Sequence, residues 1–172
     1  MPKLSAGIMV YKYVDGGVQV FLVHPGGPFW AKKDASAWSV PKGEYEESDD
    51  PWEAAKREFT EETGFMPPPG EQIDLGVVKY SNKLLTVWAV EGEVDASKVV
   101  SNTFTMEWPP KSGEQQEFPE VDRAGWFSLA IAQEKLVKGQ VPLLERLAKA
   151  LQVPIPLAES RAEPKQDQLS LF

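Results

Sequence analysis

Residues 41–65 read "PKGEYEESDDPWEAAKREFTEETGF" and combine clear helix boundaries with an unusual concentration of acidic side chains. Asp50 can cap a helix through its carboxylate, and Pro51 suits the first helical position because no backbone N–H is needed there. Gly64 can adopt the left-handed conformation that ends many helices. This stretch therefore predicts an α-helix over residues 51–63.

Three glutamates crowd one face of the predicted helix. Each residue advances about 100° around the axis, so Glu58, Glu61 and Glu62 fall within an arc of roughly 100°. Like charges at this spacing cost about 0.2 to 0.5 kcal/mol per pair in water and more in a drier site, and Arg57 offsets only part of this repulsion. Mg²⁺ and similar hard divalent ions bind carboxylate oxygens and bridge to substrate phosphates. The spacing favours a bound cation at this face; the alternative is a solvated acidic surface.

The spacing of these residues resembles the Nudix box, a pattern of glycine, glutamate, arginine and apolar positions. The residues that match its fixed positions are Gly43, Arg57, Glu58, Phe59, Glu61, Glu62, Gly64 and Phe65. The exception is Asp49, which stands where the family has glutamate and whose carboxylate has a shorter reach. Because so many positions match at fixed spacing, the chain is identified as similar to Nudix hydrolases.

The remaining sequence predicts two β-hairpins, one shorter strand and one further helix. The strands are expected at residues 5–14, 18–23, 73–80 and 84–90 and near Trp126, and the helix is expected from Pro142. The residues between the first two strands, Asp15 to Gly17, can adopt the positive φ of a tight turn. Residues 101–123 are polar and contain proline, and we expect them to form a long loop that borders the ligand site.

The Nudix resemblance implies an α/β fold, an α/β/α sandwich around a central mixed sheet. We expect a Nudix hydrolase domain over residues 1–151 and a C-terminal tail over residues 152–172, because the last segment has several prolines and few large apolar residues. The order of strands and helices alone would also fit other α+β folds, so the fold expectation depends on the box.

The resemblance also implies the reaction, which is hydrolysis of a nucleoside diphosphate linked to another moiety, with Mg²⁺ or Mn²⁺ at the pyrophosphate. By their positions in the box, Glu58 and Glu62 are the expected metal ligands, and Glu61 is a further or water-mediated ligand. Lys42 is expected to contribute its backbone carbonyl, and Arg57 to brace the glutamates. Several carboxylates suit this chemistry, because a bound metal neutralises charge on phosphate oxygens and lowers the pKa of a bound water.

The general base is less well defined, because family members place it either in the box or on a distal loop. Glu58 and Glu120 are the two candidates, and Glu120 is also a candidate metal ligand. Glu120 precedes Trp126 in "EVDRAGW", a placement similar to that of the distal glutamate in dinucleoside polyphosphate hydrolases of this family. Glu117 is an alternative to Glu120, and a solvated acidic loop is the plain alternative to both.

Substrate-binding residues are expected among the aromatic and basic side chains near the box. Tyr45, in a polar loop, is the preferred residue to stack on a nucleobase, with Trp30 among the other candidates. His24 ends a strand before a Gly-Pro-rich loop, where it could reach a phosphate, although a lone histidine there is more often structural. Lys42 is the basic candidate within the box region.

The composition excludes several classes of protein. The 172 residues carry a formal net charge of −8, which disfavours binding of duplex nucleic acid through its phosphates. The absence of cysteine excludes thiol catalysis, disulfides and thiolate metal sites. No apolar run has membrane-spanning length, and the N-terminus lacks the layout of a signal peptide, so we expect a soluble, cytoplasmic protein.

The last five residues, "QLSLF", resemble the short peptide by which many bacterial replication and repair proteins dock on the sliding clamp. The anchor positions are matched by Gln168, Leu169, Leu171 and Phe172. Apolar side chains at the end of a flexible tail suit an apolar groove on a partner, whereas a tail that folds back on its own domain is the alternative.

These features predict a metal-dependent Nudix pyrophosphohydrolase that acts on a nucleoside di-, tri- or polyphosphate derivative. A dinucleoside polyphosphate and a noncanonical nucleoside triphosphate are both candidate substrates. One alternative is hydrolysis of the 5′ ends of RNA, which the acidic charge disfavours. Another is a non-catalytic nucleotide-binding module tethered to the clamp, which the retained carboxylates of the box disfavour.

Overall fold

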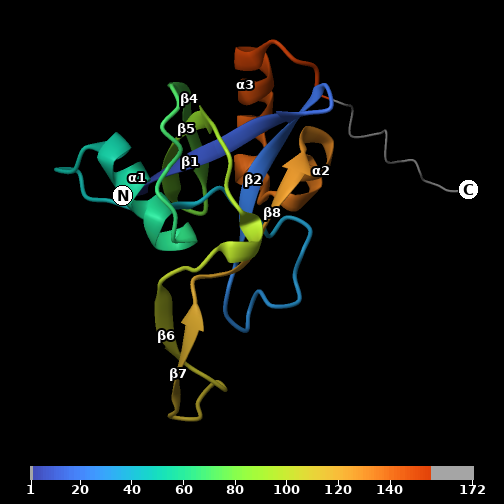
Figure 1. Ribbon diagram of the computed structural model, residues 1–172. Coiled ribbons are helices and arrows are strands. Elements are labelled where there is room, and N and C mark those ends of the chain that lie inside the picture. The colour runs from blue at the N-terminus through green and yellow to red at the C-terminus, as the bar shows by residue number, and fades with distance from the viewer. Residues whose placement is uncertain (1, 156–172) are drawn as a thin grey trace, which may run out of the picture.

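The computed structural model describes residues 2–155, and its strands and helices are shown in Figure 1. The strands are β1 (Lys3–Val14), β2 (Gly17–Pro25), β3 (Lys42–Glu44), β4 (Gln72–Tyr80), β5 (Lys83–Glu91), β6 (Thr103–Glu107), β7 (Gln115–Pro119) and β8 (Val121–Ser128). The α-helices are α1 (Pro51–Thr63), α2 (Leu129–Lys135) and α3 (Pro142–Leu151), and the 3₁₀ turns are η1 (Ala96–Lys98) and η2 (Lys138–Gln140).

The central sheet is mixed, as predicted. Its strand order is β4-β5-β1-β2-β8, and the short β3 pairs with β1. β1 runs parallel to β5, from Lys3 opposite Lys83 to Tyr11 opposite Glu91, whereas the other pairings in this sheet are antiparallel. The N-terminal strand therefore lies in the middle of the sheet.

Helices cover both faces of the sheet, which gives the predicted α/β/α sandwich (Figure 1). Successive side chains of a strand point to opposite faces. In β1, Ile8 and Val10 therefore pack in the core beneath α1, and Met9 and Tyr11 pack in the core beneath α2 and α3. The long apolar run of this strand is explained by burial on both faces.

The predicted boundaries of α1 are confirmed. The Asp50 carboxylate accepts a hydrogen bond from the backbone N–H of Glu53 at 2.9 Å, and Gly64 ends the helix with φ of 81°. Ala55 and Phe59 are fully buried against the sheet. The helix therefore buries one side and keeps its glutamate-rich side at the edge of the sheet.

The two predicted hairpins and the helix from Pro142 are also confirmed. The first hairpin turns at Asp15 and Gly16, and the second at Ser81 and Asn82, all with positive φ. In α3 the predicted apolar stripe packs on the sheet, where Leu143, Leu144 and Leu147 are fully buried.

The prediction of a long loop over residues 101–123 is wrong in part. β6 and β7 form a separate two-stranded antiparallel ribbon within this segment, and Figure 1 shows the ribbon as an arm that extends away from the sheet. Residues 103–107 read "TFTME", whose alternation of polar and apolar side chains suits a half-exposed strand. The intervening prolines and glycine concealed this pattern, because they belong to the tip of the hairpin.

Two features near the C-terminus were not predicted. α2 begins directly after β8, where the Ser128 hydroxyl accepts from the N–H of Ile131 at 3.2 Å and so caps the helix. Val153 and Ile155, which fall in the predicted tail, pack against the core beneath α2 and α3. The proposed clamp-binding residues Gln168, Leu169, Leu171 and Phe172 lie outside the described residues, so that assignment stays a prediction, as does the domain boundary at residue 151.

Among the described residues, no helix is both long and apolar enough to cross a membrane.

The burial of α3 predicts the effect of truncating its apolar stripe. Leu147→Ala removes a fully buried side chain and should lower the free energy of unfolding by about 2 to 5 kcal/mol, measured by urea denaturation. The exposed Glu145→Ala on the same helix should change the free energy of unfolding by less than about 0.5 kcal/mol. Equal effects of the two substitutions would contradict the packing of α3 described above.

Candidate active site

The acidic face of α1 lies against β3, and Gly43 makes this close approach possible. A Cβ at Gly43 would overlap the carboxylate of Glu58. The backbone N–H of the preceding residue, Lys42, donates to Glu62 Oε1 at 3.2 Å. The glycine and the glutamates of the box are therefore in direct contact, which explains why their spacing in the sequence is fixed.

Glu62 is the most buried of these carboxylates. Its pKa is raised to about 7, chiefly by burial, with smaller contributions from the charges of Glu120 and Glu58, whereas Lys42 opposes the shift through its charge and its backbone N–H. The protein thus holds a carboxylate where its ionised form is poorly solvated. A cation beside it would favour that ionised form.

Glu58 and Glu61 add further negative charge at the same place. Burial and the charge of Glu61 raise the pKa of Glu58, while Arg57 lowers it. Arg57 Nη2 lies 3.4 Å from Glu58 Oε2, and Arg57 Nε lies 3.8 Å from Glu61 Oε2. Arg57 therefore contacts both glutamates, as predicted from its place in the box, and its half-exposed side chain neutralises them only in part.

Glu120 joins this group from a distant part of the chain, where β7 ends and β8 begins. Three backbone hydrogen bonds hold it there: Asn102 N–H donates to Glu61 O at 2.8 Å, Glu120 N–H donates to Asn102 O at 2.8 Å, and Gly26 N–H donates to Glu120 O at 3.0 Å. Burial and the charge of Glu61 raise the pKa of Glu120. These bonds tie the end of α1 to the position of Glu120.

Three adjoining cavities meet at these carboxylates, because Glu62 and Glu120 line all of them. The acidic cavity, of about 380 Å³, is lined by Ser5, Lys42, Gly43, Glu44, Glu58, Glu61, Glu62, Lys83 and Glu120. The Tyr80 cavity, of about 330 Å³, also contains Trp30, Lys42 and Lys83. The Phe104 cavity, of about 470 Å³, also contains Trp30, Met106 and the loop that follows β2.

The residues of the acidic cavity fit a hard divalent cation. Carboxylate oxygens are the donors that Mg²⁺ and Mn²⁺ prefer. The buried Ser5 hydroxyl has no hydrogen-bond partner among the described residues and lines the same cavity, so it can bind a water or an oxygen of a bound group. The chemistry of these donors therefore fits the ion. Within residues 2–155, no three Asp, Glu or His side chains are already grouped closely enough to hold a metal ion.

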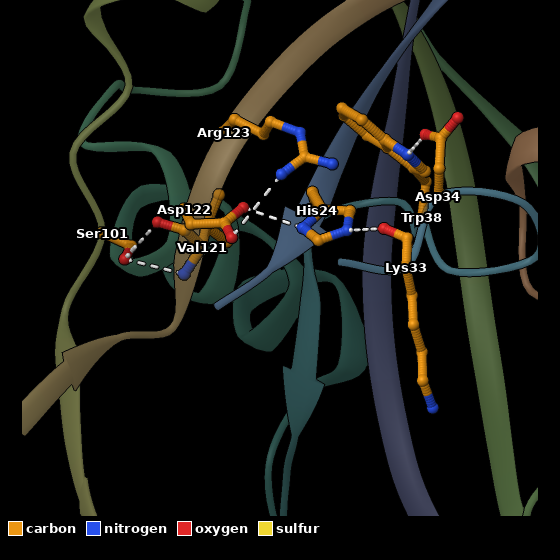
Figure 2. Close-up of polar contacts among 8 residues, drawn as sticks. All are labelled: His24, Lys33, Asp34, Trp38, Ser101, Val121, Asp122 and Arg123. Carbon is orange, nitrogen blue, oxygen red and sulfur yellow. Dashed lines mark hydrogen bonds and ion pairs between the residues drawn. The ribbon is translucent and has the colours of Figure 1, made fainter. Parts of the chain in front are cut away.

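His24 does not join the other predicted site residues. Its ring is fully buried, with Nδ1 at 2.8 Å from Asp122 Oδ1 and Nε2 at 2.6 Å from the backbone carbonyl of Lys33 (Figure 2). Neither nitrogen is free for a phosphate. The structure therefore gives His24 a structural place, in which it joins β2 to β8 and to the loop that carries Lys33.

The other predicted residues differ in whether they line the cavities at the carboxylates. Tyr45 is partly buried and packs against the core beneath α1. It lines none of the three cavities, whereas Trp30 lines two of them. Glu117 lies on β7, where its carboxylate accepts from the Thr103 hydroxyl at 2.7 Å. Asp49 folds back on its own loop and accepts from the N–H of Glu46 at 3.0 Å. Of these candidates, Trp30 and Glu120 therefore line the cavities at the carboxylates, whereas Tyr45 and Glu117 do not.

Sequence reasoning missed the residues that complete the Tyr80 cavity. Lys83, Tyr80 and Gln140 come from the β4–β5 hairpin and from η2, and no spacing in the sequence connects them with the box. Burial and the charge of Lys42 lower the pKa of Lys83. Only the fold brings this second lysine to the acidic cavity.

The family to which the chain belongs is shown by comparison with known proteins. A family model described as the NUDIX domain matches residues 1–147. The chain therefore belongs to the Nudix family of pyrophosphohydrolases. A comparison with curated protein sequences gives no significant match.

Several solved structures share this fold. A C. elegans Ap4A hydrolase in a binary complex is 19% identical, with 87% of this chain and 98% of that chain covered and a TM-score of 0.56. The NUDIX domain of Shewanella oneidensis NrtR, complexed with ADP ribose, is 19% identical, with 88% and 89% covered and a TM-score of 0.55. The C-terminal domain of mouse MUTYH, in a complex with human PCNA, is 16% identical, with 93% and 97% covered and a TM-score of 0.56. At these identities the similarity shows the fold alone.

The contact between Gly43 and Glu58 predicts the effect of adding one methyl group. Gly43→Ala should displace the Glu58 carboxylate and lower kcat/KM for pyrophosphate hydrolysis by about 10- to 100-fold, because small displacements of catalytic groups are costly. The melting temperature should change little, since the clash is with the end of a flexible side chain. Gly17→Ala, whose Cβ would meet only Val14 O at 3.6 Å, is the matched control and should keep the wild-type rate. A wild-type rate in Gly43→Ala would contradict the described contact.

The burial of His24 predicts a loss of stability with little change in rate. His24→Asn should lower the free energy of unfolding by about 1 to 3 kcal/mol, because the fully buried ring loses its contacts with the Asp122 carboxylate and the Lys33 carbonyl. At a temperature where the variant is folded, its kcat/KM should stay close to that of the wild type. Lys33→Ala is the control, because it keeps the backbone carbonyl that faces His24. A large loss of rate with unchanged stability would instead support the phosphate contact.

Proposed function

We propose that this protein hydrolyses a pyrophosphate bond in a nucleoside di-, tri- or polyphosphate derivative, with Mg²⁺ or Mn²⁺ held in the acidic cavity. The observation that carries this proposal is the meeting of three cavities at Glu62 and Glu120. Carboxylates for a metal, lysines for phosphate and an aromatic side chain for a base therefore lie side by side.

The acidic cavity supplies the metal-binding part of the site. Glu58 and Glu62 are the proposed main ligands, with Glu61 and the Lys42 carbonyl as further ones. When bound, the ion neutralises charge on the phosphate oxygens and lowers the pKa of the attacking water. Arg57 supports this arrangement, because its guanidinium contacts both Glu58 and Glu61 from the solvent side.

Glu120 is the better placed of the two candidates for the general base. Its side chain makes no hydrogen bond or ion pair with another described residue, whereas the Glu58 carboxylate lies against Arg57. Glu120 is nevertheless held firmly, since its backbone is bonded to Gly26 and Asn102. A fixed carboxylate with free oxygens at the junction of the cavities can accept the proton of a water that attacks phosphorus.

The Lys42 and Lys83 side chains are proposed to bind the phosphates. Both line the acidic cavity and the Tyr80 cavity, and neither forms an ion pair within 4.0 Å among the described residues. Two unpaired lysines in a half-buried cavity repel each other, and a polyphosphate relieves this repulsion. Trp30, at the border of the Tyr80 and Phe104 cavities, is proposed to stack on a base.

The two cavities that Trp30 lines support a substrate with two bulky ends. Both cavities reach Glu62 and Glu120, so a polyphosphate could pass the carboxylates with a nucleoside in one cavity and the second moiety in the other. This arrangement favours a dinucleoside polyphosphate over a simple nucleoside triphosphate. The two lysines suit a short polyphosphate better than the long backbone of RNA.

The roles of the box carboxylates are tested by removing their charge. Glu58→Gln and Glu62→Gln should each lower kcat/KM for a dinucleoside polyphosphate by about 10²- to 10³-fold, the usual loss when a group that stabilises transition-state charge is removed. Glu117→Gln, on the exposed β7, is the matched control and should keep wild-type activity. Products identified by mass would show which phosphoric anhydride bond is cleaved. Wild-type rates in both box variants at matched Mg²⁺ would overturn the proposed site.

A further inference from the structure

The wall of the Tyr80 cavity contains a set of buried hydrogen bonds centred on Gln140, a fully buried side chain of η2. Gln140 Nε2 donates to Ser39 Oγ at 2.9 Å and to Tyr80 OH at 3.0 Å. Its Oε1 accepts from the backbone N–H of Val40 at 3.1 Å. Because a backbone N–H only donates, it fixes which end of the amide carries oxygen, and both hydrogens of Nε2 are then in use.

This arrangement decides the direction of the remaining hydrogen bonds. Ser39 Oγ accepts from Gln140 and donates its own proton to the backbone carbonyl of Val40 at 2.6 Å, so its donor is in use. Tyr80 OH also accepts from Gln140, but its proton has no acceptor among residues 2–155. The Tyr80 hydroxyl is therefore the donor in this set that stays available to a ligand.

The Tyr80 ring is held in place by close packing. A Cβ at Gly139 would overlap the Cβ of Tyr80, so the ring rests directly on the backbone beside Gln140. Tyr80 is also opposite Lys83 at the end of the β4–β5 hairpin. The hydroxyl is thus fixed by its hydrogen bond from Gln140 and by the packing of its ring.

The other residues of the cavity suit the flat face of a base. Val23, Ala37 and Val137 supply apolar surface, and Trp30 supplies an aromatic one. Lys42 and Lys83 lie where the cavity meets the acidic cavity. A nucleotide with its phosphates at the lysines would place its base among the apolar residues and the hydroxyl of Tyr80.

We propose that Tyr80 is a specificity-determining residue that donates a hydrogen bond to a carbonyl oxygen of the nucleobase, and that Gln140 is its positioning residue. The protein then prefers a 6-oxopurine to a 6-aminopurine. A carbonyl accepts the free proton of Tyr80, whereas an amino group at the same position presents hydrogens to it and leaves the hydroxyl of this partly buried residue without an acceptor. This inference rests on the proposed function, since it assigns the base of the proposed nucleotide substrate.

The inference is tested by measuring the Kd of inosine 5′-monophosphate and adenosine 5′-monophosphate by calorimetry in the presence of Mg²⁺. These ligands differ only at the 6 position and the adjoining ring nitrogen. The wild type should bind the inosine nucleotide about tenfold more tightly. Tyr80→Phe should lose this preference, because it removes both the hydrogen bond to the inosine nucleotide and the unpaired donor that disfavours the adenosine nucleotide.

Ser39→Ala is the matched control. Like Tyr80→Phe, it removes an acceptor of Gln140 and leaves one buried N–H unpaired, but it keeps the Tyr80 hydroxyl. It should retain the tenfold preference, because Gln140 still bonds the Tyr80 hydroxyl and that hydroxyl keeps its free proton.

The wild-type comparison tests the inference even if a variant does not fold. Equal affinity for the two nucleotides in the wild type, or a preference that survives in Tyr80→Phe, would overturn the role of Tyr80 and leave the proposed hydrolysis intact. If the wild type binds neither nucleotide while it hydrolyses a dinucleoside polyphosphate, the inference alone fails. If it neither binds nor hydrolyses any nucleotide, the proposed function fails with it.

Discussion

The contact between α1 and β3 at Gly43 constrains the whole acidic site. Glycine lets the carboxylate of Glu58 rest where any other residue would place its Cβ, and the neighbouring backbone N–H of Lys42 then reaches Glu62. This approach buries both carboxylates and brings like charges together. Burial is the main reason that the pKa values of Glu58 and Glu62 are raised, and the neighbouring negative charges add to it. The repulsion is a local cost that the buried side of α1 offsets through Ala55 and Phe59.

The rest of the site is assembled around this contact by backbone hydrogen bonds. The bonds that connect Glu61, Asn102, Glu120 and Gly26 join the end of α1 to the start of β8 and to the loop after β2. Glu120 therefore takes its position from main-chain geometry and keeps its carboxylate free. The β6–β7 ribbon begins directly after Asn102 and ends directly before Glu120. Phe104 and Met106 of the ribbon therefore help to form the cavity next to Glu120.

Local patterns in the sequence predicted most of the fold. Capping by Asp50 and the glycine at position 64 predicted α1, and the turn residues Asp15 to Gly17 predicted the first hairpin, because each signal acts within a few residues. The box likewise grouped Glu58, Glu61 and Glu62 correctly on one face. The Tyr80 cavity was out of reach, since Ser39, Tyr80 and Gln140 meet only through the packing of distant segments. For His24 the sequence predicted a functional role that the structure does not support. A polar side chain beside a glycine-rich loop suggested a ligand-binding residue, but the ring is buried between Asp122 and the Lys33 carbonyl, which is a structural role.

The parallel pairing of β1 with β5 also has a consequence for how the protein is made. β1 is synthesised before the other strands of the sheet, but the strand that covers its second edge ends only at Glu91, and the strand that covers the outer edge of β2 ends at Ser128. Closing loops of this length is entropically unfavourable and slows folding. During synthesis, the first hairpin therefore emerges with open edges and apolar side chains on both faces, which are the features that invite pairing with another chain. The order of translation thus makes the most buried part of the finished protein the part most exposed to aggregation while the chain is still incomplete.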